Sequence, residues 1–121
     1  MIYLEKVSKK YPNNTVALND ITFAINKGEF VSVVGHSGAG KTTILKMIIA
    51  EYSPTAGNVF YHSSDIHKLS RRDILNYRRK VGVVFQDGRL LPNKTAFENV
   101  AFAMEVAGRE DSEIEADVPG V

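Results

Sequence analysis

The chain has 121 residues, of which 44% are hydrophobic and 24% charged, and its formal net charge is +1. This is the composition of an ordinary globular protein, and the near-neutral total gives no overall field for nucleic acid or an acidic membrane surface. The chain has no cysteine, which excludes disulfides, thiolate metal sites and a cysteine nucleophile. No signal-peptide layout and no apolar run of ~20 residues occur, so we expect a soluble chain whose membrane role comes through a partner.

The N-terminal residues predict two short strands. Apolar Ile2, Leu4 and Val7 alternate with polar residues, which is typical of a strand with one buried face. A turn is expected at residues 11–14, where proline and asparagine favour tight backbone, and a second strand at residues 17–25.

The next apolar run, residues 30–34, has the pattern of a strand covered on both faces in a parallel sheet. It leads directly into Gly35-His36-Ser37-Gly38-Ala39-Gly40-Lys41-Thr42, which has the G-x-x-x-x-G-K-[ST] spacing of a phosphate-binding loop. A helix should follow from about Lys41 to Ala50. Its apolar stripe is expected at Ile44, Leu45, Ile48 and Ile49.

The residue types of this loop suit phosphate binding. Glycines let successive N–H groups turn inward, and the start of the helix adds free N–H groups and a positive dipole end. The ammonium of Lys41 can reach β- and γ-phosphates, and the Thr42 hydroxyl can complete the shell of a Mg²⁺ ion. The loop therefore predicts a nucleoside triphosphate bound through its phosphates.

The second half predicts further elements in order. A strand is expected at residues 58–61, a helix from the capping residues 70–73 to Lys80, and a second buried-type strand at residues 81–85. Gln86 then stands at the end of a strand, where open α/β sheets place ligands.

The C-terminal part predicts two helices. Residues 95–98 form a capping box, and Gly108 should end the helix that it starts. The apolar stripe of this helix is expected at Phe97, Val100, Ala101 and Met104. The acidic tail from Arg109 onwards is expected to begin one more helix at Asp111 or Ser112 and to reach residues 119–121 without a closing element.

With the loop, further segments resemble the N-terminal half of an ABC-type ATPase, and within that superfamily the ATPases of bacterial cell division. They are residues 7–11, 17–21, 54–57, 65–69, 78–87 and 95–100. The resemblance implies an α/β P-loop NTPase with an N-terminal antiparallel β-subdomain and the start of a helical subdomain, an incomplete domain. Residues 1–86 would hold the β-subdomain, the P-loop core and the Q-loop, and residues 87–121 the start of the helical subdomain.

The resemblance also implies roles for single residues. Tyr11 matches the aromatic residue that stacks on adenine, and Val16 a nearby apolar contact. Gln86 matches the Q-loop glutamine, which joins the Mg²⁺ shell and senses the γ-phosphate, and acts in catalysis with Lys41. Nucleotide-binding positions are thus Tyr11, Val16, Ser37, Gly38, Ala39, Gly40, Lys41, Thr42 and Thr43. From the residues alone, surface packing for Tyr11 and an ordinary strand-end position for Gln86 remain open.

After Gln86 the family docks an integral-membrane, permease-like subunit, so Leu90, Leu91, Phe97 and Phe102 form either a docking groove or ordinary core. The complete protein would be an ATP-dependent homodimer at the cytoplasmic face of the plasma membrane. This chain lacks the family's Ser-Gly-Gly signature segment, the apolar strand ending in Asp-Glu and the switch histidine. We therefore expect it to bind Mg·ATP weakly without turnover, and to expose apolar strand edges that favour aggregation.

Other interpretations are weaker. A GTPase needs an Asn-Lys-x-Asp segment, which residues 93–96 fail to complete, and a small-molecule kinase does not explain Tyr11 and Gln86. A noncatalytic, nucleotide-dependent assembly module and a solute-transport ATPase stay open. The basic residues Arg71, Arg72, Arg78, Arg79 and Lys80 are interpreted as a solvated helix face and not as a nucleic-acid site. The histidines His36, His62 and His67 form no convincing metal site.

Overall fold

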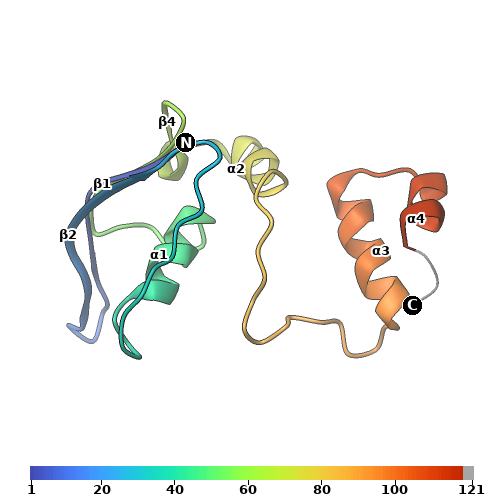
Figure 1. The fold of residues 1–121 in the computed structure, drawn as a ribbon, viewed down its shortest axis with the longest axis horizontal. Helices are drawn as coiled ribbons and strands as arrows, with labels where there is room; N and C mark the ends of the chain where they lie inside the picture. The colour runs from blue at the N-terminus through green and yellow to red at the C-terminus, as the bar shows by residue number, and fades with distance from the viewer. Residues whose placement is uncertain (119–121) are drawn as a thin grey trace. The chain divides into compact units, whose positions relative to one another are not determined.

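The computed structural model describes residues 1–118, so the expectation for residues 119–121 lies outside the described part. The chain divides into two compact units, Met1–Val81 and Gly82–Val121, which Figure 1 draws from blue to yellow and from yellow to red. Among the described residues, no helix has both the length and the apolar character needed to cross a bilayer.

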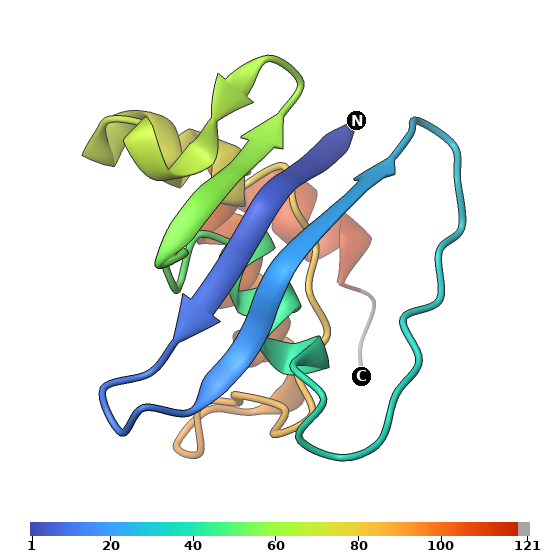
Figure 2. The ribbon, with the colours of Figure 1, turned by 90° about the vertical axis from the view of Figure 1, so that its left-hand side faces the viewer.

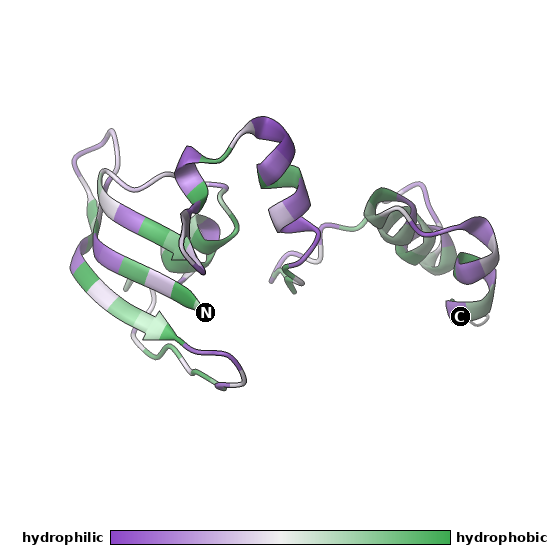
Figure 3. Ribbon diagram, turned by 90° about the horizontal axis from the view of Figure 1, so that it is seen from above, coloured by the Kyte–Doolittle hydropathy of each residue, from purple (hydrophilic) through white to green (hydrophobic). Residues whose placement is uncertain are grey.

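The first unit is built on an antiparallel sheet. Strand β1 (Ile2–Lys10) pairs with β2 (Val16–Ile25) on one side and with β3 (Ala56–Tyr61) on the other, and the short β4 (Ser64–Asp65) extends the sheet beyond β3. Figure 2 shows these strands face-on, and Figure 3 shows hydrophobic and hydrophilic residues alternating along them. The three strands expected from alternation and from short β-rich runs are confirmed, and each is longer than predicted.

Helix α1 (Lys41–Ile48) covers one face of this sheet (Figures 1 and 2), and the core lies between them. The predicted apolar stripe of α1 is partly wrong. Thr43 and Met47, four residues apart, are buried, whereas Leu45 is 36% exposed. The direction in which the sheet lies decides which face of the helix is covered, and hydropathy alone does not reveal it. The buried core residues of this unit are Leu4, Val7, Leu18, Met47, Val59, Ile66 and Tyr77.

A short 3-10 turn, Ile66–Lys68, precedes helix α2 (Arg71–Arg78), which begins as predicted: the Ser70 hydroxyl accepts a hydrogen bond from the Asp73 N–H at 3.2 Å. Within the basic cluster, Arg78 is exposed, as predicted, but its guanidinium also bonds the backbone that follows α1. Its Nε donates to the Ile49 carbonyl at 3.0 Å and its Nη2 to the Ala50 carbonyl at 2.8 Å. Carbonyls that follow a helix have no intrahelical donor, and a guanidinium placed beside them satisfies that need.

The two runs predicted as buried parallel strands form no strand in the structure. Residues 30–34 and 81–85 are irregular, and Phe30 is 98%, Val34 87% and Val84 97% exposed. A strand exists only where a neighbour takes up its hydrogen bonds, and the sheet of the described residues has the order β2-β1-β3-β4, without these runs. Their exposure accords with the expectation of uncovered apolar segments in this chain.

The second unit contains helices α3 (Ala96–Ala107) and α4 (Asp111–Asp117). Thr95 and Glu98 form the predicted capping box, and Gly108 ends α3 with a φ of 84°, a left-handed conformation that glycine adopts without steric cost. The small core consists of Ala101, Ile114 and Val118, with Phe97 and Met104 packed against it. Val100, predicted in the apolar stripe, is instead 47% exposed, because the residues that pack against α4 lie on the face of Ala101.

Candidate phosphate-binding site

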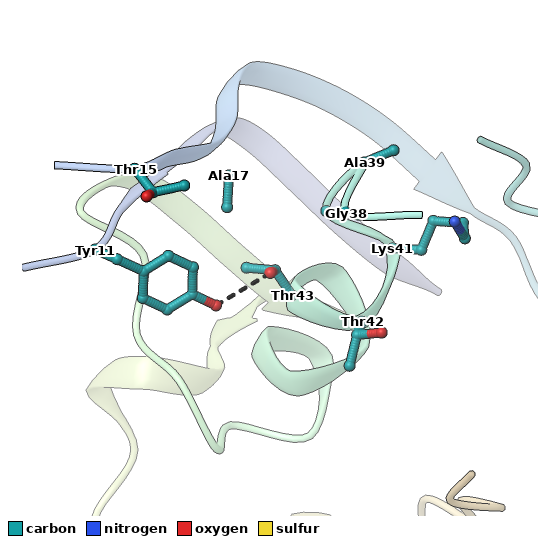
Figure 4. Close-up of a pocket in the computed structure, with 9 residues that line it drawn as sticks. Tyr11, Thr15, Ala17, Gly38, Ala39, Lys41, Thr42 and Thr43 are labelled. Carbon is teal, nitrogen blue, oxygen red and sulfur yellow. Dashed lines mark hydrogen bonds between the residues drawn. The ribbon is translucent and has the colours of Figure 1, made fainter. Parts of the chain in front are cut away.

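The turn after β1 and the glycine-rich loop form the walls of one pocket. It has a volume of about 190 Å³ and is lined by Tyr11, Thr15, Ala17 and residues 38–43 (Figure 4). Two segments predicted to act on one ligand, far apart in the sequence, therefore meet in the first unit. The pocket has Tyr11 and Thr15 at one end and Gly38, Ala39 and Lys41 at the other.

The backbone of the loop depends on two glycines. Gly38 has a φ of 80° and Gly40, the N-cap of α1, a φ of 86°. A Cβ at Gly40 would lie 2.5 Å from the Ala17 carbonyl oxygen and 2.7 Å from Leu18 Cδ2, so only glycine allows the loop to touch β2 there. At Gly38 a Cβ would meet nothing within 4 Å, and the constraint is the backbone conformation alone.

The loop presents N–H groups without internal acceptors. Helix α1 starts without a side-chain cap, and its first hydrogen bond runs from the Ile44 N–H to the Gly40 carbonyl at 3.0 Å. Within residues 1–118, the N–H groups of Gly38, Gly40, Lys41 and Thr42 donate to no protein acceptor. Such N–H groups, together with the positive end of the helix dipole, make a site for an anion.

Lys41 is bonded to the loop itself. Its ammonium donates to the Gly35 carbonyl at 2.7 Å and to the His36 carbonyl at 2.8 Å. Figure 4 shows its side chain extending away from Tyr11. The His36 ring is likewise turned onto the loop, with Nδ1 2.8 Å from the Ser37 carbonyl oxygen. Thr42 is exposed at the first turn of α1, where its hydroxyl can serve as an oxygen ligand.

At the other end, the Tyr11 hydroxyl and the Thr43 Oγ1 are joined by a hydrogen bond of 3.1 Å (Figure 4). Thr43 is 7% exposed, so this bond fixes the half-buried tyrosine to the first turn of α1. Two further residues predicted to contact nucleotide, Val16 and Ser37, are exposed and are not among the lining residues.

The sequence pattern did not predict Thr15 and Ala17, which line the pocket beside Tyr11. For both residues, the sequence holds a feature that could have indicated their position. The Tyr11 N–H donates to the Thr15 carbonyl at 2.9 Å, so the predicted turn brings these residues together. Ala17 follows Val16 in β2, and consecutive strand residues face opposite sides of the sheet, so only one of the two can face α1.

Gln86 belongs to the second unit, where it is exposed in the turn after residues 81–85, and its role stays a prediction. Of the residues considered for docking, Phe97 packs in the core of that unit, whereas Leu90 is 72%, Leu91 39% and Phe102 49% exposed. Throughout residues 1–118, no group of three or more histidine, aspartate or glutamate side chains is arranged to hold a metal ion.

Comparison with known proteins decides the family. A family model described as ABC transporter matches residues 18–119. The chain belongs to the ABC transporter family. It is 51% identical over 118 residues to the cell division ATP-binding protein FtsE of Bacillus subtilis, which covers 98% of the chain and 52% of that protein. It is 43% identical over 103 residues to the phosphonates import ATP-binding protein PhnC of Lactococcus lactis, which covers 85% of the chain and 42% of that protein.

Solved ABC structures share the fold. A dimeric ATP-binding cassette in a post-hydrolysis state, bound to ADP and Pi, superposes with a TM-score of 0.88 at 33% identity, over 98% of this chain and 54% of that one. The predicted fold class is therefore confirmed, because the chain folds as part of an ABC ATPase domain. The chain spans about half the length of the ABC relatives that it matches.

Proposed function

We propose that this chain binds ATP as the nucleotide-gripping part of an ABC ATPase that, as a complete protein, drives a membrane partner in bacterial cell division. The observation that carries the proposal is the pocket shared by Tyr11 and the glycine-rich loop. A base-stacking ring at one end and free N–H groups at the other match the two ends of a nucleoside triphosphate.

The phosphate end follows from the loop. The free N–H groups of Gly38, Gly40, Lys41 and Thr42 donate to phosphate oxygens. The Lys41 ammonium exchanges its two carbonyl acceptors for oxygens of the β- and γ-phosphates. The exposed hydroxyl of Thr42 is a hard oxygen donor of the kind that suits Mg²⁺. When bound, this ion neutralises charge on the phosphates.

The base end follows from Tyr11. Its ring stacks on adenine, beside Thr15, which lines the same end of the pocket. Stacking alone distinguishes bases weakly, since every base has a π-face, so adenine is inferred from the family and not from a base-specific hydrogen bond.

The complete protein acts as an ATP-dependent homodimer at the cytoplasmic face of the plasma membrane. Its partner is an integral-membrane, permease-like subunit of the FtsX type, docked by the region after Gln86. The identity of 51% to an FtsE protein and the exposed Leu90 and Phe102 support this assignment. The 121-residue chain alone does not turn over ATP, because the carboxylates that orient water in phosphoryl transfer belong to a segment that its sequence lacks.

A solute-transport ATPase is the second candidate function. The identity of 43% to a phosphonate import ATPase favours it, since the same loop and pocket would serve both. Complementation separates the two. The complete protein should restore division in a bacterium that lacks its own FtsE, and failure to do so with intact partner-stimulated ATP hydrolysis would favour transport.

Calorimetric titration of the purified chain with Mg·ATP tests the nucleotide site. We expect binding that Lys41→Ala weakens at least about tenfold, since a charge-assisted phosphate contact is lost. Lys27→Ala, in the exposed connection after β2, is the control and should leave the affinity unchanged. A chain that binds no ATP would refute the site, and sustained hydrolysis that Lys41→Ala abolishes would refute the inactivity of the chain alone.

A further inference from the structure

Tyr11 has a second aromatic neighbour besides its hydroxyl contact with Thr43. The rings of Tyr11 and Tyr52 are perpendicular, with an interplanar angle of 82° and centroids 6.1 Å apart. This edge-to-face arrangement is the one that aromatic quadrupoles prefer. Tyr52 is half-buried just after α1, outside the residues that line the pocket.

Tyr52 is in turn fixed to α1. The ammonium of Lys46 lies 4.7 Å from the centroid of its ring and 3.4 Å from its hydroxyl oxygen. The Tyr52 N–H donates to the Lys46 carbonyl at 3.1 Å, and the Lys46 ammonium is paired with Glu51 at 3.3 Å. The orientation of this ring is therefore set by a side chain and a carbonyl of the helix that carries the phosphate-binding loop.

Lys9 of β1 contacts both tyrosine rings. Its ammonium is 5.7 Å from the ring centroids of both Tyr11 and Tyr52, and it donates to the Ser53 carbonyl at 2.6 Å. The contacts thus run from Thr43 in the first turn of α1 through Tyr11 and Tyr52 back to Lys46 in the next turn. Such a closed set holds the Tyr11 ring from two sides before any ligand arrives.

We infer that Tyr52, held by Lys46, is a positioning residue that orients the Tyr11 ring for the base of the nucleotide. The inference rests on the proposed function, in which Tyr11 stacks on adenine. A ring already fixed loses little side-chain freedom when a base stacks on it, so the gain from stacking appears in full as affinity. Tyr52 itself touches no part of the nucleotide.

The test compares ATP with inorganic tripolyphosphate, which offers phosphates without a base, by calorimetric titration of the chain. Tyr52→Ala should weaken ATP binding by about three- to tenfold and leave tripolyphosphate binding unchanged. Tyr52→Phe keeps the ring pair and should rescue ATP binding to within about twofold. Lys46→Met, which keeps the aliphatic stem but frees the ring, should weaken ATP binding by about two- to threefold.

A matched control and a double-mutant cycle complete the experiment. Tyr3→Ala removes a ring stacked on Phe60, on a pair distinct from Tyr11 and Tyr52, and should change neither affinity. In a Tyr11→Ala background, Tyr52→Ala should have no further effect on ATP binding, since Tyr52 acts only through Tyr11.

Equal losses of ATP and tripolyphosphate in Tyr52→Ala would mark a purely structural residue and overturn the inference. Independent effects in the double mutant would overturn it as well. If wild-type chain binds no ATP, or if Tyr11→Ala leaves ATP binding intact, the proposed nucleotide site itself fails. Loss of ATP binding in Tyr11→Ala without any change in Tyr52→Ala would refute the inference alone.

Discussion

Two structural constraints require glycine at position 40. Its backbone is left-handed, with a φ of 86°, and its Cα faces the Ala17 carbonyl and Leu18 of β2. The first requirement belongs to the conformation of the glycine-rich loop and the second to the packing of that loop on the sheet. Gly38 has a similar φ of 80° but open space around it. Substitution at Gly38 therefore tests the backbone conformation alone, whereas substitution at Gly40 tests the conformation together with the steric contact with β2.

Gly40→Ala should therefore destabilise the first unit more than Gly38→Ala. The left-handed backbone costs about 1–2 kcal/mol for alanine at either position. At Gly40 the clash with β2 adds to this, for a total on the order of 3 kcal/mol. Urea unfolding followed by circular dichroism measures both free energies of unfolding. Equal losses for the two variants would show that the contact with β2 carries no energy.

Among single residues, the sequence predicted those whose role depends on their immediate neighbours in the chain. The spacing of Gly35, Gly40 and Lys41 fixes a loop whatever surrounds it, and the pocket does contain Lys41 and Thr42. Thr15 and Ala17 escaped prediction because a small side chain lines a pocket only through the packing of β2 beside the loop. The contact between the rings of Tyr11 and Tyr52 could not be predicted either, because it depends on the path of the chain after α1.

Among the elements, α2 acts on the end of α1. The Tyr77 hydroxyl donates to the Ile48 carbonyl, and Arg78 donates to the next two carbonyls, Ile49 and Ala50. Burial raises the pKa of Tyr77 to about 12, so its hydroxyl remains a donor across the physiological range. The positively charged guanidinium also lies at the negative end of the α1 dipole.

Arg78→Met should lower the free energy of unfolding of the chain by about 1 kcal/mol, because the carbonyls of Ile49 and Ala50 lose their donors while the aliphatic stem is kept. Arg79→Met is the matched control. Arg79 is exposed, and we expect its replacement to change the stability by less than about 0.5 kcal/mol. Urea denaturation distinguishes the two, and similar effects would argue against a role for Arg78 at the end of α1.

Element prediction succeeded where the signal was local and failed where it was not. Alternation defined β1 and β2, and the capping residues Ser70 and Thr95 marked the starts of α2 and α3. The runs 30–34 and 81–85 have strong β propensity, yet a strand needs a partner, and the order β2-β1-β3-β4 includes neither. High β propensity allows a segment to form a strand, but the strand forms only where a neighbouring strand pairs with it.

For the whole molecule, these apolar runs determine solution behaviour. Phe30, Val34 and Val84 are nearly fully exposed, and unpaired backbone beside apolar side chains is a template for association. We expect the 121-residue chain to associate at micromolar concentration, as measured by light scattering, and the double variant Phe30→Lys, Val84→Lys to reduce this association severalfold. The control Leu75→Lys changes an exposed apolar residue within α2 and should have little effect. A wild-type chain that stays monodisperse and unfolds cooperatively as a monomer would contradict the prediction.

The carbonyl bonds of Lys41 have a consequence for how ligands arrive. In the described part of the chain its ammonium contacts the neutral carbonyls of Gly35 and His36, so no carboxylate there neutralises its charge. The positive potential of this lysine and of the α1 N-terminus thus extends into solvent and attracts anions over a distance of about 10 Å at ordinary salt. In the proposed site, Lys41 has two hydrogen bonds to neutral carbonyls to exchange and no ion pair to break, so we expect the rate of phosphate binding to depend on ionic strength and not on the opening of a salt bridge.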